Sequence, residues 1–138
     1  MKPELQISKV EDINEWLQVC SEEYVASQSI SWIIDHVGRL CGELAFVNAQ
    51  MPVAKQVLNK KKVSEYNTLK ISSESQKEYY APSLAKDYIA AKCEAAQYDY
   101  DVCERASRTL THVLDIMRSV LSALKEEAKI NNYAGSVV

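Results

Sequence analysis

Glycine and proline are scarce in this chain, with three of each among 138 residues. Few positions can therefore form tight turns, which disfavours β-hairpins and the glycine-rich loops that hold phosphates. No apolar run approaches the roughly 18 residues that a membrane-spanning helix requires. The first residues, MKPELQISKVEDINEW, alternate polar and apolar side chains too closely for a signal peptide. We therefore expect a soluble, cytoplasmic protein built from long helices, with no membrane partner.

Sequence signatures of enzymes and of metal sites are also lacking. The chain holds no His-Glu-x-x-His, Gly-x-Ser-x-Gly or Gly-Lys-Ser stretch. Its two histidines, His36 and His112, lack a further ligand at a suitable spacing. The four cysteines form no Cys-x-x-Cys pair and lie in apolar helical patterns, so we interpret them as buried thiols. They are Cys20, Cys41, Cys93 and Cys103. We expect no enzymatic activity, no catalytic residue, no cofactor and no metal.

The first strong helical signal lies between residues 30 and 51. Apolar residues recur there in steps of three and four, which is the spacing of a coiled-coil seam. They are Ile30, Ile33, Val37, Leu40, Leu44, Val47 and Met51. Gly38 and Gly42 share this segment, and we interpret them as a place where a neighbouring helix packs closely. With a capping box at Ser8–Glu11, the pattern predicts a first long helix over 8–51, with or without a break, that Pro52 ends or kinks.

From residue 63 to residue 82 the apolar pattern dissolves and predicts a polar connector, whereas residues 53–62 can continue the helix beyond Pro52. Residues 53–82 are predicted to form a basic helix end and a polar connector. A second long helix is expected over 83–129, with a frayed tail over 130–138. The sequence thus predicts a single all-α domain, in which two long helices form a hairpin-like protomer with a short N-terminal helical segment.

The apolar face of the C-terminal helix is wider than one partner helix can cover. An isolated hairpin would leave much of residues 106–124 in water, and apolar patches of that size usually mark contact surfaces. We therefore expect identical subunits to associate into a symmetric helical bundle or ring, a homo-oligomer. The residues expected to hold the subunits together are Leu110, Val113, Leu114, Met117, Val120, Leu121 and Leu124.

Positive charge is concentrated in one part of an otherwise acidic chain. Residues 53–77 contain six lysines and two glutamates, a net charge of +4, whereas the remainder carries −7 and the total is −3. One interpretation is that Lys60, Lys61 and Lys62 stay hydrated at a helix end. The other is that they neutralise phosphates, which makes binding strongly salt-dependent. The predicted nucleic-acid-binding residues are Lys55, Lys60, Lys61, Lys62, Tyr66 and Lys70. The tyrosines that could stack on unpaired bases are Tyr66, Tyr79 and Tyr80.

Three stretches together suggest a family. The segment EEYVASQSISWIIDHVGRL leads into a long helix, the basic stretch NKKKVSEYN ends it, and a long oligomerising helix follows. This layout resembles the UvsY-type recombination mediators of T-even-like phages over most of residues 20–128, although the family's Ser-Gly turn is absent here. In that family, small helical subunits assemble into a ring and bind single-stranded DNA. The resemblance implies that Lys60, Lys61 and Lys62 contact DNA, with Tyr66 as a companion.

Three functions follow from these observations. The resemblance implies a non-enzymatic mediator that binds single-stranded DNA and helps load or remodel a recombinase filament on strands covered by single-strand-binding protein. The second is a helical scaffold or adaptor whose apolar seam grips a different protein. The third is an oligomeric sponge that sequesters small anionic nucleotides.

Overall fold

The computed structural model describes residues 4–27, 30–76 and 81–137, apart from the side chains of 25–27, 76 and 133–137. Within these ranges the chain forms four helices and no strand, so the predicted all-α class is confirmed. The helices are α1 (Ile7–Ser27), α2 (Ile30–Gln76), α3 (Pro82–Lys92) and α4 (Glu94–Val137). None of these described helices combines the length and apolar character needed to cross a membrane.

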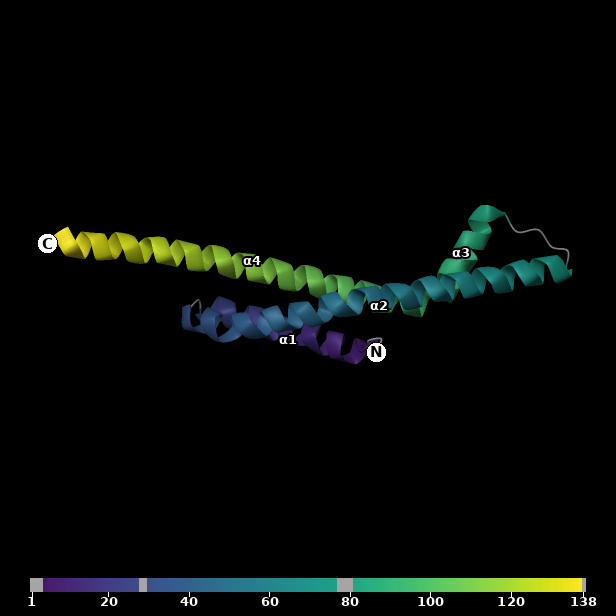
Figure 1. The fold of residues 1–138 in the computed structure, drawn as a ribbon, viewed down its shortest axis with the longest axis horizontal. Helices are drawn as coiled ribbons and strands as arrows, with labels where there is room; N and C mark the ends of the chain where they lie inside the picture. Colours follow the sequence, from purple (N-terminus) through teal and green to yellow (C-terminus); the bar gives the residue numbers. More distant parts are fainter. Residues whose placement is uncertain (1–3, 28–29, 77–80, 138) are drawn as a thin grey trace.

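Three of the helices lie side by side in the middle of the molecule. α2 packs against α4, and α1 contacts both of them. α2 runs opposite to α1 and α4, while α3 belongs to the return from the far end of α2 to α4 (Figure 1). Beyond Ala54 in α2 and beyond Leu121 in α4, neither helix contributes to the central core. We call residues 55–76 the α2 arm and residues 122–137 the α4 arm; they extend in opposite directions from a three-helix middle (Figure 1).

Seven-residue spacing explains how this middle is held together. Core side chains of α2 and α4 recur every seven residues, a repeat that keeps one side of a helix facing its partner. In α2 they are Ile33, Leu40, Val47 and Ala54, and in α4 they are Cys103, Leu110 and Met117. α1 adds Val10, Ile13 and Leu17, spaced by three and four residues. Most of the seam predicted over 30–51 thus packs inside one chain, although Ile30 at its start is exposed.

The presence of α1 as a separate helix changes the packing of α4. A two-helix hairpin would leave the second apolar row of α4 in water. In the structure α1 packs against α4, Ala106 is fully buried, and Val113 and Val120 are half-buried against the core. The prediction that one chain leaves much of this stripe exposed is therefore wrong, because the segment expected as a long helix over 8–51, with or without a break, supplies two helices to the core.

Pro52 neither ends α2 nor marks the start of a connector. α2 passes through Pro52 and continues to Gln76, so of the two predicted outcomes, an end or a kink at Pro52, the end is wrong. Proline removes one backbone hydrogen bond, here to the carbonyl of Asn48, and crowds that carbonyl. Pro52 is exposed, so the carbonyl of Asn48 lies towards water. Core contacts on both sides, at Val47 and Ala54, hold the helix together across the defect.

The polar connector predicted over 63–82 is also wrong for residues 63–76, which are helical. Leu69 is buried on this stretch, and α3 packs against α2. Residues 77–80, including Tyr79 and Tyr80, lie outside the described residues.

Several helix ends differ from those predicted. α1 begins at Ile7, so Ser8 lies inside the first turn instead of capping it. The helix expected over 83–129 begins at Pro82 and is interrupted at Cys93, whose amide donates to the carbonyl oxygens of Ile89 and Ala90 at 3.0 and 3.2 Å. α4 then continues to Val137, through most of the expected tail. The polar sequence near the C-terminus was thus interpreted as a frayed tail, although the backbone there remains helical.

Gly38 and Gly42 do not mediate close helix packing within the chain. A β-carbon placed on either residue would meet no atom within 4 Å, and both residues are exposed. The interpretation of the pair as a close-packing site is therefore wrong for the isolated chain, because the core face of α2 lies on the opposite side, at Leu40 and Val47.

Candidate nucleic-acid interface

The three consecutive lysines do not form one patch. Lys60, Lys61 and Lys62 are all exposed on the α2 arm, but successive helical residues point about 100° apart. Lys61 is already paired, with its Nζ 3.0 Å from Oε1 of Glu65 one turn further along. The lysine run predicted as a unit is therefore divided among three sides of the helix.

A longer set of basic residues does lie along one side. Lys55, Lys62, Tyr66 and Lys70 are separated by seven, four and four residues, which returns each side chain to nearly the same side of α2. All four are exposed, and Tyr66 keeps 55% of its surface accessible. We call this set the lysine–tyrosine flank. It spans about 22 Å along the helix axis. Three cations and one aromatic ring thus form a continuous polar strip, and the structure supplies this arrangement only because residues 55–70 are helical.

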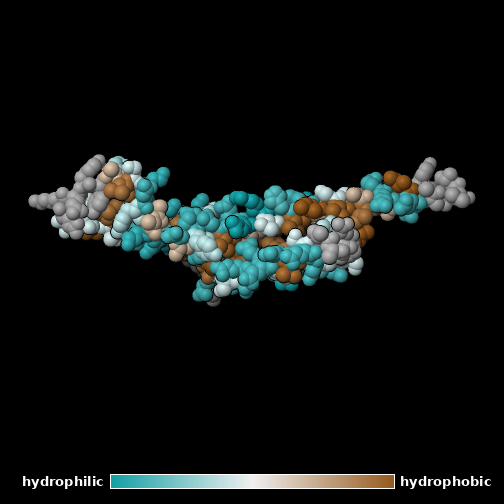
Figure 2. All heavy atoms as spheres, turned by 180° about the vertical axis from the view of Figure 1, so that it is seen from behind, coloured by the Kyte–Doolittle hydropathy of each residue, from teal (hydrophilic) through white to brown (hydrophobic). Residues whose placement is uncertain are grey.

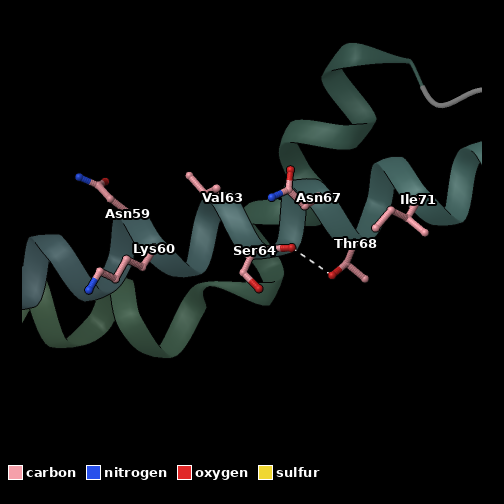
Figure 3. A pocket seen from close by; sticks show the side chains of 7 residues that line it. All are labelled: Asn59, Lys60, Val63, Ser64, Asn67, Thr68 and Ile71. Carbon is pink, nitrogen blue, oxygen red and sulfur yellow. Dashed lines mark hydrogen bonds between the residues drawn. The ribbon is translucent and has the colours of Figure 1, made fainter.

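Next to this flank, the outward side of the α2 arm is a shallow hollow. It is lined by Asn59, Lys60, Val63, Ser64, Asn67, Thr68 and Ile71 (Figure 3). Thr68 Oγ1 donates to the carbonyl oxygen of Ser64 at 3.0 Å, which turns that hydroxyl towards its own backbone. Val63 and Ile71 are 61% and 67% exposed. All of the described residues that line this hollow come from one helix, and the hollow is open to solvent.

Exposed apolar side chains gather at this end of the molecule. In Figure 2 some hydrophobic residues are visible over the end formed by the α2 arm and α3, and a broader hydrophobic area lies over the three-helix middle. α3 buries none of its own residues, and Leu84 and Tyr88, four residues apart on it, are both exposed. Lys92 lies over the Tyr88 ring at 5.5 Å from the ring centroid. This end therefore combines cations, aromatic rings and uncovered aliphatic groups.

The residues predicted to hold subunits together lie on α4 but mostly face their own chain. Leu110 and Met117 are buried, and the half-buried residues of the set pack against the same core. These half-buried residues are Val113, Leu114, Val120 and Leu121. Leu124, at the start of the α4 arm, is half-buried and lies outside that core. Leu124 is thus the one member of the set that does not pack against the central core.

An acidic groove between α1 and α4 was not predicted from the sequence. Its α1 rim carries Glu11, Glu15 and Glu22, and its α4 rim carries Asp101 and Arg105. Leu17, Val102 and Val113 also line it, and all three are at least half-buried. The exposed ring of Tyr98 stands at one end of the α4 rim. The α1 carboxylates come from the stretches EDINE and SEE, which in the sequence are typical of ordinary surface charge. Their place in a groove becomes evident only from the packing of α1 beside α4.

Neither histidine lies in an arrangement suited to catalysis. The His36 ring stacks on Trp32 with 4.1 Å between centroids, and its Nδ1 lies 2.8 Å from the Trp32 carbonyl oxygen. The Trp32 ring also contacts the ring of Tyr24, and these two centroids lie 5.4 Å apart. His112 is exposed on α4. Within the described part of the chain, no three His, Cys, Asp or Glu side chains converge as metal ligands would.

The cysteines are free thiols, and three of the four are buried. Cys20, Cys93 and Cys103 are buried as predicted, whereas Cys41 is exposed, contrary to the prediction. Burial raises the pKa of Cys20 and of Cys103, and the carboxylates of Glu23 and Asp99 respectively raise it further. These thiols therefore act as small apolar side chains.

Taken together, the fold and this surface define an elongated helical protein with a cationic, tyrosine-containing helix flank at one end. No family model, curated protein or solved structure matches the chain.

Proposed function

We propose that this protein binds single-stranded DNA without catalysing a reaction, and that the lysine–tyrosine flank of α2 is its binding surface. The observation that carries this proposal is the alignment of Lys55, Lys62 and Lys70 with the exposed ring of Tyr66 along one side of a helix. Lysine ammonium groups neutralise phosphates as point charges, and an aromatic ring can stack on an unpaired base of any identity. The combination favours a single strand, whose bases are free to stack.

The spacing of the flank fits a backbone contact that does not read sequence. Lys55 and Lys62 are about 10 Å apart along the helix axis, and Lys62 and Lys70 about 12 Å. Long, flexible lysine side chains can adjust to phosphates at these separations. Each phosphate neutralised releases condensed counterions, so affinity is expected to fall as salt rises. One flank supplies few contacts, and an assembly of several copies would strengthen binding through avidity.

The resemblance to UvsY-type mediators extends this proposal to a biological role. On that basis the protein helps to load or remodel a recombinase filament on strands coated with single-strand-binding protein, which makes both proteins candidate partners. The departures from the family pattern concern the DNA-binding region. Because the lysine run is split around the helix, the proposed DNA contacts are Lys62 with Lys55 and Lys70, in place of Lys60–Lys62 as a block.

A salt titration with two matched double variants tests the proposal. Fluorescence anisotropy of a labelled oligothymidine is measured with wild type, Lys55→Gln/Lys62→Gln and Lys61→Gln/Lys125→Gln. Both variants lose two positive charges, but only the first alters the flank. We expect the first to reduce the magnitude of the slope of log affinity against log salt by about 1.4, at roughly 0.7 per phosphate contact, and the second to change it little.

Three results would contradict the proposal in different ways. Absence of binding by the wild type at low salt rejects DNA binding altogether. Equal losses in the two variants show that net charge matters and the flank does not. Complete competition by a mononucleotide, with no dependence on strand length, favours the sponge.

A second candidate function is a scaffold that binds a different protein, and α3 is the observation that favours it. Leu84 and Tyr88 are 57% and 42% exposed on a short helix with no buried residue. Apolar groups four residues apart on one helix suit docking into another protein's groove. Under this function the Lys55→Gln/Lys62→Gln variant retains partner binding, whereas Leu84→Asp/Tyr88→Asp loses it.

A further inference from the structure

We propose that the outward face of the α2 arm of one copy docks into the acidic groove between α1 and α4 of a second copy. The docking face consists of Lys60, Val63, Asn67, Lys70 and Ile71. The groove has Glu11, Glu15, Glu22 and Asp101 on its rims. This inference deepens the proposed function by defining how copies associate, and it rests on that function only where it concerns DNA.

The groove has the features of a site for a helix. It extends along α4 from Tyr98 to Val113, about 22 Å of helix, and along α1 from Glu11 to Glu22, about 16 Å. Its half-buried apolar lining can receive aliphatic side chains, while its rims carry four carboxylates against the single guanidinium of Arg105. A helix-in-groove contact requires this arrangement of apolar floor and polar rim.

The docking face has the complementary features. Val63 and Ile71, two turns apart, are the large aliphatic side chains on it, and both are more than half exposed. Lys60 and Lys70 lie at opposite ends of the face, where they can meet carboxylates. From Lys60 to Ile71 the face is about 16 Å long, which matches the α1 rim of the groove. In Figure 3 no helix covers the labelled side chains of this face, and among the described residues their hollow is lined by α2.

The α2 arm cannot occupy the groove of its own chain. α2 is a continuous helix from Ile30 to Gln76, so the α2 arm cannot fold back onto the three-helix middle to which the groove belongs. A second copy supplies a helix of matching charge and length. The segregation of charge in the sequence, +4 over residues 53–77 and −7 elsewhere, places the two complementary surfaces in different parts of every copy.

The contact joins two different surfaces, so it is heterologous. Repetition of such a contact generates a closed ring or an open chain, depending on the rotation between neighbours. Each residue of a helix is rotated by about 100° from the one before it, so the lysine–tyrosine flank lies roughly a quarter turn around α2 from the docking face. Most of each flank therefore stays free in the assembly, with Lys70 at the boundary between the two surfaces.

Mass measurement of the full chain with paired charge reversals tests the contact. We expect wild type to scatter light as a multiple of the 15.6 kDa chain mass. Val63→Asp/Ile71→Asp, Lys60→Glu and Glu15→Lys are each expected to shift the mass towards 15.6 kDa. The combined variant Lys60→Glu/Glu15→Lys is expected to recover the larger mass, and an equimolar mixture of the two single variants is expected to form mixed assemblies. Lys125→Glu, on the α4 arm, is the control and should leave the mass unchanged.

Several outcomes overturn the contact. They are a wild-type mass of 15.6 kDa at all concentrations, an unchanged mass for the docking-face and groove variants, or no recovery in the charge swap. Helical circular dichroism of each variant shows that the chain has folded, and the swap distinguishes contact loss from misfolding. The DNA proposal fails separately: Lys55→Gln/Lys62→Gln should alter strand binding with unchanged mass, so a normal assembly that binds no DNA rejects only the proposed function.

Discussion

The buried side chain of Gln50 fastens the N-terminal segment to α2 through the backbone of Gln6. The Gln6 amide donates to Gln50 Oε1 at 2.6 Å, and Gln50 Nε2 donates to the carbonyl oxygen of Glu4 at 2.9 Å. Gln50 is only 2% exposed. Its amide thus satisfies two backbone groups just before α1, in the manner of a cap supplied by another helix.

Replacement of this residue should be costly. We expect Gln50→Ala to lower the free energy of unfolding by about 1–3 kcal/mol, since two partner groups lose hydrogen bonds in a partly buried site. Gln56→Ala, at an exposed position of the same helix, should change it by less than about 0.5 kcal/mol. Urea unfolding followed by circular dichroism measures both values. Equal effects would show that the Gln50 contacts contribute no net stability.

The exposed glycines of α2 offer a gain in stability. Gly38→Ala and Gly42→Ala should each raise the free energy of unfolding by up to about 1 kcal/mol, because alanine favours helix and an added β-carbon meets no atom within 4 Å. Ala45→Gly, on an exposed site nearby, should lower it by a similar amount. Thermal unfolding of the three variants provides the comparison. Destabilisation by either alanine would reveal a contact with another molecule at this position.

Asp99 is expected to reduce stability at neutral pH. Burial raises the pKa of its carboxyl, so the folded chain binds this proton more tightly than the unfolded chain does. The stability contributed by the protonated group is present below the ordinary carboxyl pKa and is lost as pH rises through the raised value. Asp99→Asn should therefore increase the melting temperature at about pH 7, with the gain shrinking towards about pH 3.

The neighbouring acid supplies the control. Asp101→Asn alters an exposed carboxylate that accepts a hydrogen bond from Gln97 at 2.9 Å. It should show no comparable gain at neutral pH. A gain for Asp99→Asn that persists unchanged at low pH would show that the benefit comes from packing, independent of charge.

Thiol labelling should separate the cysteines. Cys41 is expected to react with a maleimide well before Cys20 and Cys103, because these two are buried and burial raises the pKa of their thiols. Peptide mass spectrometry after brief labelling at neutral pH identifies the modified residue. Rapid labelling of Cys103 in the native protein would mean that the α2–α4 contact opens readily.

Tyr66 provides a specific test of base stacking. Tyr66→Ala should weaken binding of an oligothymidine by about 1–3 kcal/mol if the ring stacks on one base, with the salt dependence unchanged. Tyr88→Ala removes an exposed ring from α3, outside the flank, the docking face and the groove, and should not affect DNA binding. Anisotropy titrations at constant protein concentration measure both. A loss equal in the two variants would point to a general effect on folding or assembly.

The all-α class and the core-facing stripe of α2 could be predicted from the sequence because the central helices bury regular stripes. Ile33, Leu40 and Val47 repeat at seven-residue intervals, and the structure buries all three. Residues 63–76 of the α2 arm were not predicted to be helical because only a few side chains of the arm are buried, among them Leu58 and Leu69, and because Pro52 was expected to end or kink the helix. The helix nevertheless continues, because Pro52 is exposed and α2 packs against α3.

The candidate site was predictable only in part, for a related reason. Charge counting identified the lysine-rich region, but grouping by adjacency placed Lys60 and Lys61 with Lys62, although a helix separates consecutive side chains. Once residues 55–70 are known to be helical, the seven- and four-residue spacing from Lys55 to Lys70 can be read directly. The acidic groove depends on which helix lies beside α4, and no local pattern of charge carries that information.

The unbroken passage of α2 through Pro52 has a mechanical consequence. Its 47 residues form a strut about 70 Å long, fixed at one end by α1 and α4 and bearing the cationic flank towards the other. Under the proposed DNA contact, tension on a strand held at Lys62 and Tyr66 acts as leverage on the three-helix middle, because α2 is one continuous helix between them.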